Sequence, residues 1–90
     1  MVQLQGSVVE DMQLNEAVSK RLSELLAQRN MTNYQLYMKS GVPKSTIGNI
    51  INCTYDSMKL RVIHEICQGL DISMTEFFQS PLFDENNLEP

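Results

Sequence analysis

Apolar residues recur at helical spacing in the first half of the chain. Val18, Leu22, Leu25 and Leu26 stand at i, i+4, i+7 and i+8, which places all four on one face of a helix. We expect this helix to cover residues 15–30. The charged residues of the same stretch fall on other faces, so the helix is predicted to lie on the surface with one buried side.

Capping and turn residues mark the ends of further helices. Asn15 is expected to cap the first helix, and Thr32 is expected to cap a second helix that ends near residue 40. Gly41 can adopt the left-handed conformation that closes a helix. Pro43 suits the start of the next helix, where a missing N–H does no harm. Two short helices joined by a tight turn are therefore predicted here.

A third helix is expected over residues 44–52. Its apolar residues Ile47, Ile50 and Ile51 face inward, and Thr46 faces inward or sideways. The remaining small, polar and basic residues form an outward edge: Lys44, Ser45, Gly48 and Asn49. Two helices with a tight turn and such an edge are typical of a helix-turn-helix.

The second half of the chain predicts two more helices. A loop over residues 53–59 precedes a fourth helix over residues 60–70. The apolar face of that helix is expected to contain Leu60, Ile63, Ile66, Cys67 and Leu70. Ser73, with Glu76 three residues later, predicts the capping box of a short fifth helix that ends before Pro81.

These elements predict one all-α domain with a small core, since 90 residues bury only about 60 % of their unfolded surface. Residues 1–14 are expected to be a flexible arm, or alternatively a short strand or partner contact. Residues 15–80 form the domain, and residues 81–90 form a mobile acidic tail. In that region Leu82 and Phe83 belong either to the core or to a dimer contact.

Charge is distributed unevenly along the chain. The net charge is −4, but all seven basic residues lie in the window 20–61, which holds only two acids and has a local charge of +5. Binding to phosphates depends on local surface charge rather than on the sum over the chain. The window is therefore compatible with a nucleic acid partner, although the acidic ends weaken nonspecific affinity.

Several function classes find no support in the residues. No catalytic Ser/His/Asp set, carboxylate pair, glycine-rich phosphate loop or metal-ligand spacing is present, so no enzyme, cofactor or metal is expected. Cys53 and Cys67 are interpreted as reduced thiols, and His64 as a half-buried structural residue. Without an apolar run of about 18 residues or a secretory signal, no membrane association and a cytoplasmic location are expected.

The outward edge of the third helix fits base recognition in the major groove. Lysine can donate to guanine O6 or N7, asparagine can pair bidentately with adenine, and serine suits either base. A solvated helix face would show the same polar residues. Gly48 costs about 1 kcal/mol relative to alanine in mid-helix, which either a close backbone approach to DNA or tolerated drift explains.

The pattern resembles the lambda-repressor-like, Cro/Xre family of helix-turn-helix domains over about residues 16–80. The resemblance rests on the apolar stripe of the first helix and on a set of later residues: MT at 31–32, Leu36, GVPKSTIGNI at 41–50, Asn52 and LRVIHEICQGLDISMTEFF at 60–78. The resemblance implies a compact five-helix bundle whose third helix lies in the major groove of DNA.

The resemblance also implies roles for individual residues. The positions that contact bases in the family correspond here to Lys44, Ser45 and Asn49. Contacts to the DNA backbone are expected from a second set: Asn33, Thr46, Asn52, Lys59 and Arg61. Asn33 and Asn52 can equally serve as helix caps, and Lys20, Arg21 and Lys39 are interpreted as ordinary surface charges.

Two residues depart from the family pattern. Tyr37 stands where the family has a small residue, so it is expected to lean outward or to open the angle between the helices. Cys53 replaces the usual glycine after Asn52, so the turn there is expected to be strained or differently shaped.

The expected function is that of a sequence-specific DNA-binding transcriptional regulator, in particular a repressor. It would bind double-stranded DNA as a homodimer at half-sites about one helical turn apart. The alternative is a protein-interaction module or an antitoxin with the same fold. The overall acidity, the single charge on the reading edge and Tyr37 favour that alternative.

Overall fold

The computed structural model describes residues 13–55 and 57–88, and in these ranges the chain is all-α, as predicted. Five α-helices are followed by two short 3-10 helices: α2 (Leu14–Gln28), α3 (Asn33–Ser40), α4 (Lys44–Ile51), α5 (Leu60–Leu70), α6 (Met74–Phe78), η1 (Pro81–Phe83) and η2 (Glu85–Asn87). The predicted arm over residues 1–14 lies almost entirely outside the described residues, which begin at Gln13.

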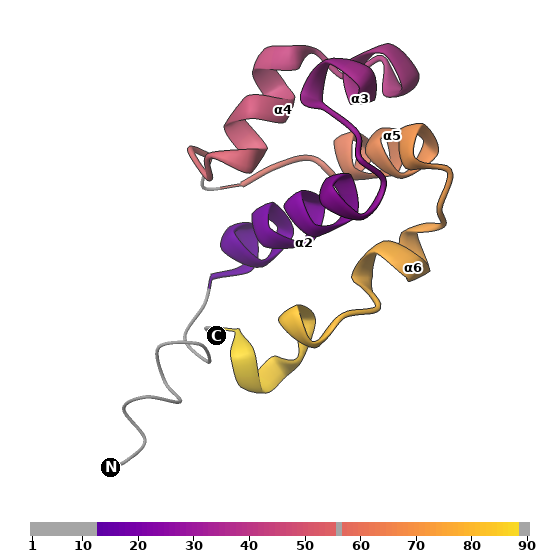
Figure 1. The fold of residues 1–90 in the computed structure, drawn as a ribbon. Helices are drawn as coiled ribbons and strands as arrows, with labels where there is room; N and C mark the ends of the chain where they lie inside the picture. Colours follow the sequence, from indigo (N-terminus) through magenta and orange to yellow (C-terminus); the bar gives the residue numbers. More distant parts are fainter. Residues whose placement is uncertain (1–12, 56, 89–90) are drawn as a thin grey trace.

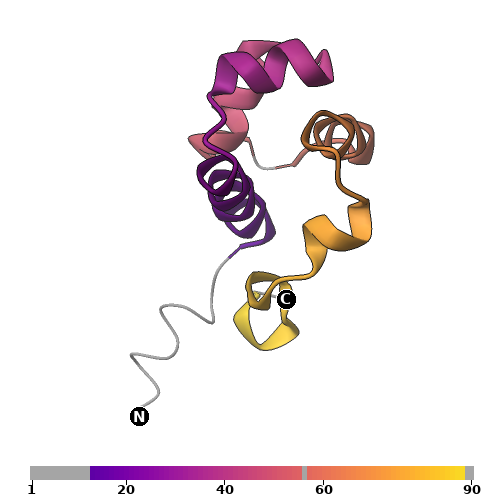
Figure 2. The same ribbon diagram turned by 45° about the vertical axis from the view of Figure 1, so that its right-hand side comes forward.

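The helices are arranged around α2. In both views α3 and α4 lie together at one end of the molecule, and the two 3-10 helices lie at the other (Figures 1 and 2). α3 packs against α5 and α4, while α2 packs against α4 and η1. α4 lies on an outer side of the bundle, with its C-terminal end beside the first half of α2 (Figure 1).

The core is built from the apolar stripes that the sequence pattern predicts. Its members come from every α-helix and from the turn after Gly41: Val18, Leu22, Leu25, Leu26, Leu36, Val42, Ile47, Ile50, Ile63, Ile66, Cys67, Leu70 and Phe77. Burial of such side chains is the main favourable term in folding, at about 25 cal/mol per Å² of apolar surface. Ile47 and Ile50 are both buried, and their burial fixes the position of α4 against the core.

Two of the three predicted helix N-caps are present, and the third prediction is wrong. Thr32 caps α3 in a reciprocal box with Gln35, and Ser73 accepts the Glu76 N–H at 3.0 Å at the start of α6. The cap of α2 is Gln13 rather than Asn15, because the helix begins at Leu14 and Asn15 already lies in its first turn. From that position the Asn15 Nδ2 donates to the Tyr55 carbonyl, 40 residues away.

α3 and α5 pack extensively against each other and approach closely at Gly69. A Cβ added at Gly69 would lie 2.7 Å from the Cβ of Ser40 and 3.1 Å from its backbone nitrogen. Only a glycine in α5 allows the two backbones to approach this closely. Gly69 therefore sets the position of the helix-turn-helix unit on the rest of the bundle.

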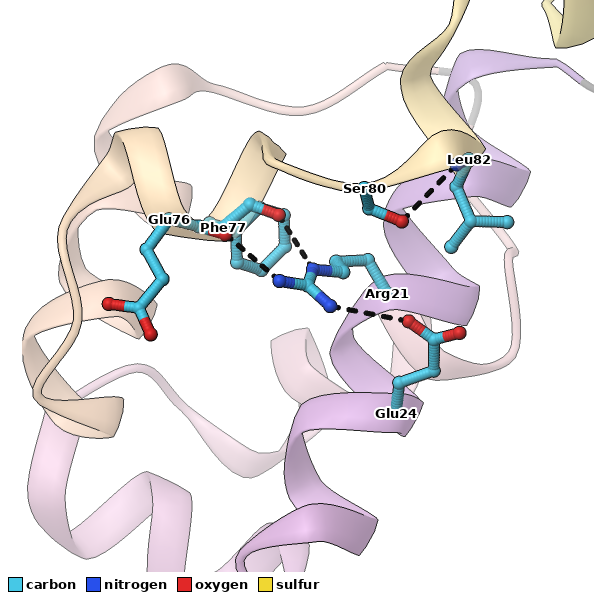
Figure 3. A network of polar contacts seen from close by, with 6 residues as sticks. All are labelled: Arg21, Glu24, Glu76, Phe77, Ser80 and Leu82. Carbon is cyan, nitrogen blue, oxygen red and sulfur yellow. Dashed lines mark hydrogen bonds and ion pairs between the residues drawn. The ribbon is translucent and has the colours of Figure 1, made fainter.

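Arg21 holds α2 against the C-terminal end of α6, which corrects its interpretation as an ordinary surface charge. Its Nε donates to the Phe77 carbonyl at 2.7 Å, and its Nη2 donates to the Glu76 carbonyl at 2.9 Å (Figure 3). Glu24 lies 3.4 Å from Nη1 on the same helix. The side chain is only 12 % exposed. A guanidinium at the end of a helix satisfies carbonyls that have no intrahelical partner and matches the helix dipole there.

The segment from Pro81 onward differs from the mobile tail that the sequence predicts. Residues 81–88 fold into η1 and η2, and η1 lies against α2. The ring of Phe83 packs edge-on against Phe78 at 4.9 Å between centroids and lies 6.3 Å from Phe77. These aromatic contacts order the segment because they extend the core beyond α6.

Two residues of α5 lie differently from the prediction. Leu60 is 72 % exposed, because it stands in the first turn of the helix, beyond the edge of the core. It lines a shallow apolar hollow with Leu14 and Phe78. His64 is exposed rather than half-buried, since the buried face of α5 is centred on Ile63, Ile66 and Cys67.

Candidate nucleic-acid interface

The outward edge of α4 is present, although its residues differ in exposure. Lys44 and Ser45 are exposed in the first turn of the helix, where backbone N–H groups have no intrahelical partner. Thr46, Gly48 and Asn49 are partly buried. Because Ile47 and Ile50 anchor the opposite side of α4 in the core, the edge faces away from the bundle.

Lys44 lies beside Tyr34 of α3, whose ring in turn lies near that of Tyr37. Its Nζ is 5.3 Å from the centre of the Tyr34 ring, which is within reach of a cation–π interaction. The rings of Tyr34 and Tyr37 are 6.0 Å apart. Tyr37 is exposed, as expected of a bulky residue at a position where two helices cross closely. This aromatic pair borders the edge of α4 on one side.

Asn49 is held at both ends of its amide group. Its Nδ2 donates to the Tyr55 hydroxyl at 2.9 Å, and its Oδ1 accepts from the Thr54 hydroxyl at 3.0 Å. Both partners belong to the segment that follows α4. The predicted base-reading amide is therefore not a freely rotating surface group.

The turn after α4 explains how those partners reach Asn49. Thr54 N–H donates to the Asn49 carbonyl at 2.9 Å and Cys53 N–H donates to the Ile50 carbonyl at 3.1 Å, which is the Schellman pattern of helix closure. Cys53 sits at the left-handed position with φ 58°. Of the two outcomes predicted for this turn, strain or a different shape, the left-handed φ supports strain, because such φ values cost about 1–2 kcal/mol for residues other than glycine.

Two side chains of α2 fasten the end of α4 and the following loop. The Ser19 hydroxyl donates to the Ile51 carbonyl at 2.7 Å, and Asn15 Nδ2 donates to the Tyr55 carbonyl at 2.6 Å. Asn15 and Ser19 are one helical turn apart on α2 and therefore lie on the same face of the helix. They give the last turn of α4 and Tyr55 a fixed place on the longest helix.

The residues predicted to contact a DNA backbone surround α4. Asn33 is exposed in the first turn of α3, and Asn52 is exposed at the end of α4. Thr46 faces sideways into a shallow hollow that it shares with Tyr55, Met58 and Lys59. Thr46 therefore takes one of the two orientations that the helical pattern allows.

Exposed cations stand at the start of α5, beyond the hollow. Lys59 precedes the helix and is exposed, and the Arg61 side chain is 84 % exposed at 3.8 Å from Glu65. An ion pair at this distance and exposure is weak, so the guanidinium remains accessible to a phosphate. Lys44, Lys59 and Arg61 thus supply positive charge on both sides of the α4 edge.

Sequence reasoning missed the groups that bind the edge from within the molecule. Tyr55 and Thr54 bind Asn49, and Tyr34 contacts Lys44. One signal was available: when a left-handed residue follows a helix, the next residues return toward its last turn. Cys53 in the position of a glycine was that signal, but the identity of the contacts depends on the folded loop.

Other chemistry is not assembled in the part of the chain that the structure describes. Residues 13–55 and 57–88 contain no group of three or more His, Cys, Asp or Glu that could hold a metal ion. Burial raises the pKa of the Cys67 thiol, and Glu76 raises it further, so this thiol is protonated at neutral pH. No helix among the described residues has the length and apolar character needed to span a membrane.

Comparison with known proteins gives one match. No curated protein and no solved structure matches the chain significantly. A family model described as a Cro/C1-type HTH DNA-binding domain matches residues 21–80, which include α3, α4, α5, α6 and most of α2. The matched stretch is two-thirds of the chain and contains the whole helix-turn-helix. The chain therefore belongs to the Cro/C1-type helix-turn-helix DNA-binding domains.

Proposed function

We propose that this protein is a sequence-specific transcriptional regulator, in particular a repressor, that inserts α4 into the major groove of its operator. The observation that carries the proposal is the edge of α4, which presents Lys44 and Ser45 outward while Ile47 and Ile50 fix the helix in the core. A rigidly held helix can place its side chains against base edges with little loss of conformational freedom.

Residue roles follow from where each group stands around α4. Lys44, Ser45 and Asn49 are proposed to read bases. Backbone contacts are assigned to the surrounding polar and basic groups: Asn33, Thr46, Asn52, Lys59 and Arg61. Contacts to the DNA backbone position a protein on the duplex and carry no sequence information directly. The chain is proposed to act in the cytoplasm, as a homodimer on paired half-sites.

Selection from a pool of random duplex DNA tests this proposal. At low salt the purified protein should enrich one motif, with half-sites about one helical turn apart. Asn49→Ala should relax the preference at one position of that motif. Lys59→Ala and Arg61→Ala should instead weaken binding to all sequences about equally, and each should reduce the salt slope by about 1. Failure to enrich any motif would contradict the proposal.

A second candidate is a protein-interaction module or an antitoxin with the same fold. The net charge of −4 favours it, as does the occupation of Lys44 and Asn49 by contacts within the molecule. The same selection separates the two functions. A protein that binds a partner through α4 would enrich no motif, yet substitutions at Lys44 or Ser45 would weaken its complex with that partner.

A further inference from the structure

We infer that Tyr55 and Thr54 are positioning residues that preset the Asn49 amide for bidentate contact with an adenine. This inference rests on the proposed function, because it concerns how one base-reading side chain of α4 is held. It assigns a recognition role to the loop after the helix-turn-helix. Neither Tyr55 nor Thr54 needs to touch DNA for that role.

The hydrogen-bonding capacity of the amide supports the inference. An asparagine side chain has two N–H donors and two lone pairs on its oxygen. The Tyr55 hydroxyl uses one donor at 2.9 Å, and the Thr54 hydroxyl uses one lone pair at 3.0 Å. One N–H and one lone pair remain. Adenine presents the complementary pair in the major groove, an acceptor at N7 and a donor at N6.

The two hydroxyls are themselves fixed in place. Thr54 is part of the Schellman turn, and its N–H donates to the Asn49 carbonyl at 2.9 Å. The Tyr55 ring is partly buried, and its carbonyl accepts from Asn15 of α2 at 2.6 Å. The amide is therefore held by groups that are attached to the bundle, and not by flexible surface side chains.

Fixing the amide before binding should sharpen sequence choice. Immobilising a side chain at an interface costs about 0.5–1.5 kcal/mol, which corresponds to roughly a two- to tenfold change in affinity. If Tyr55 and Thr54 have already ordered Asn49, DNA binding does not incur that loss at this position. The gain appears only with the base pair that Asn49 reads, since nonspecific binding depends on phosphate contacts.

The experiment measures discrimination at the base pair read by Asn49. Two duplexes are compared, the enriched motif and the motif changed at the position that Asn49→Ala relaxes. The ratio of their dissociation constants is measured for the wild type, Tyr55→Phe and Thr54→Val. The control is Thr75→Val, which removes an exposed hydroxyl of α6 that has no hydrogen bond to the described residues.

We expect Tyr55→Phe and Thr54→Val each to lower the ratio about three- to tenfold, with unchanged affinity for nonspecific DNA and unchanged salt slope. Thr54→Ser, which keeps the hydroxyl, should restore the ratio, and Thr75→Val should leave it unchanged. In an Asn49→Ala background, Tyr55→Phe should have no further effect, since the interaction that it modulates is gone.

A second measurement on the free protein guards against effects of misfolding. In ¹⁵N relaxation, the Asn49 side-chain amide should be as rigid as the backbone of α4 in the wild type and more mobile in Tyr55→Phe. The inference is overturned if Asn49→Ala abolishes discrimination while Tyr55→Phe leaves it unchanged or increases it. If the wild type enriches no motif, or Asn49→Ala alters none, the proposed function fails at this residue and the inference fails with it.

Discussion

Two glycines within helices, Gly48 in α4 and Gly69 in α5, have opposite surroundings. A Cβ at Gly69 would collide with the Cβ of Ser40, whereas a Cβ at Gly48 would meet no atom within 4 Å. Packing within the molecule thus accounts for Gly69 but not for Gly48. A glycine that costs helix stability and makes no close packing contact is explained either by a close approach of the DNA backbone or by tolerated drift.

The contrast extends to the regions around the two glycines. Contacts within the molecule dominate one region, where Gly69 of α5 lies against Ser40 of α3 and Arg21 of α2 donates hydrogen bonds to two carbonyls of α6. The outer side of α4 carries exposed polar groups and no large apolar side chain. The first region is therefore held by contacts within the molecule, whereas the outer side of α4 leaves its polar groups accessible to a partner.

The largest expected effect on stability is at Arg21. Arg21→Met should lower the free energy of unfolding by about 3 kcal/mol, because two carbonyls at the end of α6 lose their charged donor. Urea unfolding measures this change. Lys20→Met, at an exposed neighbouring position, is the control and should stay within about 0.5 kcal/mol of the wild type. Equal effects of the two substitutions would show that Arg21 is an ordinary surface charge.

Gly69→Ala should destabilise the protein by about 2 kcal/mol. The new methyl group forces α3 and α5 apart, and this cost exceeds the gain in helix propensity of about 1 kcal/mol. The same urea titration measures the effect. A neutral or stabilising outcome would mean that the contact between α5 and Ser40 relaxes easily, and the contrast between the two glycines would lose its basis.

Gly48→Ala should act in the opposite direction on stability. The open space at this position predicts a gain of about 1 kcal/mol in the free energy of unfolding. Affinity for the selected duplex should nevertheless fall about tenfold, if the backbone of α4 approaches the DNA closely. Unfolding and binding are measured on the same preparation. A stabilised variant with unchanged DNA affinity would instead support tolerated drift at Gly48.

The smallest effect is expected at the turn after α4. Cys53→Gly should stabilise the protein by about 0.5 kcal/mol, because relief of the left-handed strain slightly exceeds the entropy gained by the unfolded chain. Thermal unfolding with the wild type in parallel measures it. A loss of stability would show that the half-buried cysteine side chain contributes more by packing than its φ value costs.

Much of the fold could be predicted because its signals are local. The bounds of α5 match the prediction at both ends, and Thr32 and Gly41 act as expected at the ends of α3. The exposure of Leu60 could not be predicted in the same way. Its helical spacing places it on the apolar face, but the core ends before it, and only the arrangement of whole helices shows where a core ends.

The candidate site was less predictable than the fold. The exposure of Lys44 and Ser45 follows from the pattern of α4 alone. The hydrogen bonds of Asn49 depend on a turn that brings Tyr55 back over the helix, and those of Asn15 and Arg21 join residues 40 or more positions apart. Contacts of that kind have no periodicity in the sequence, so a pattern can place a side chain on a face without revealing its partners.

An amide chemical-shift titration of the ¹⁵N-labelled protein with the selected duplex tests the central claim most directly. The account predicts that the largest shifts fall on residues 44–52, with smaller ones at the starts of α3 and α5, while α6 and η1 remain unchanged. Shifts concentrated on α6 and η1, with none along α4, would contradict it.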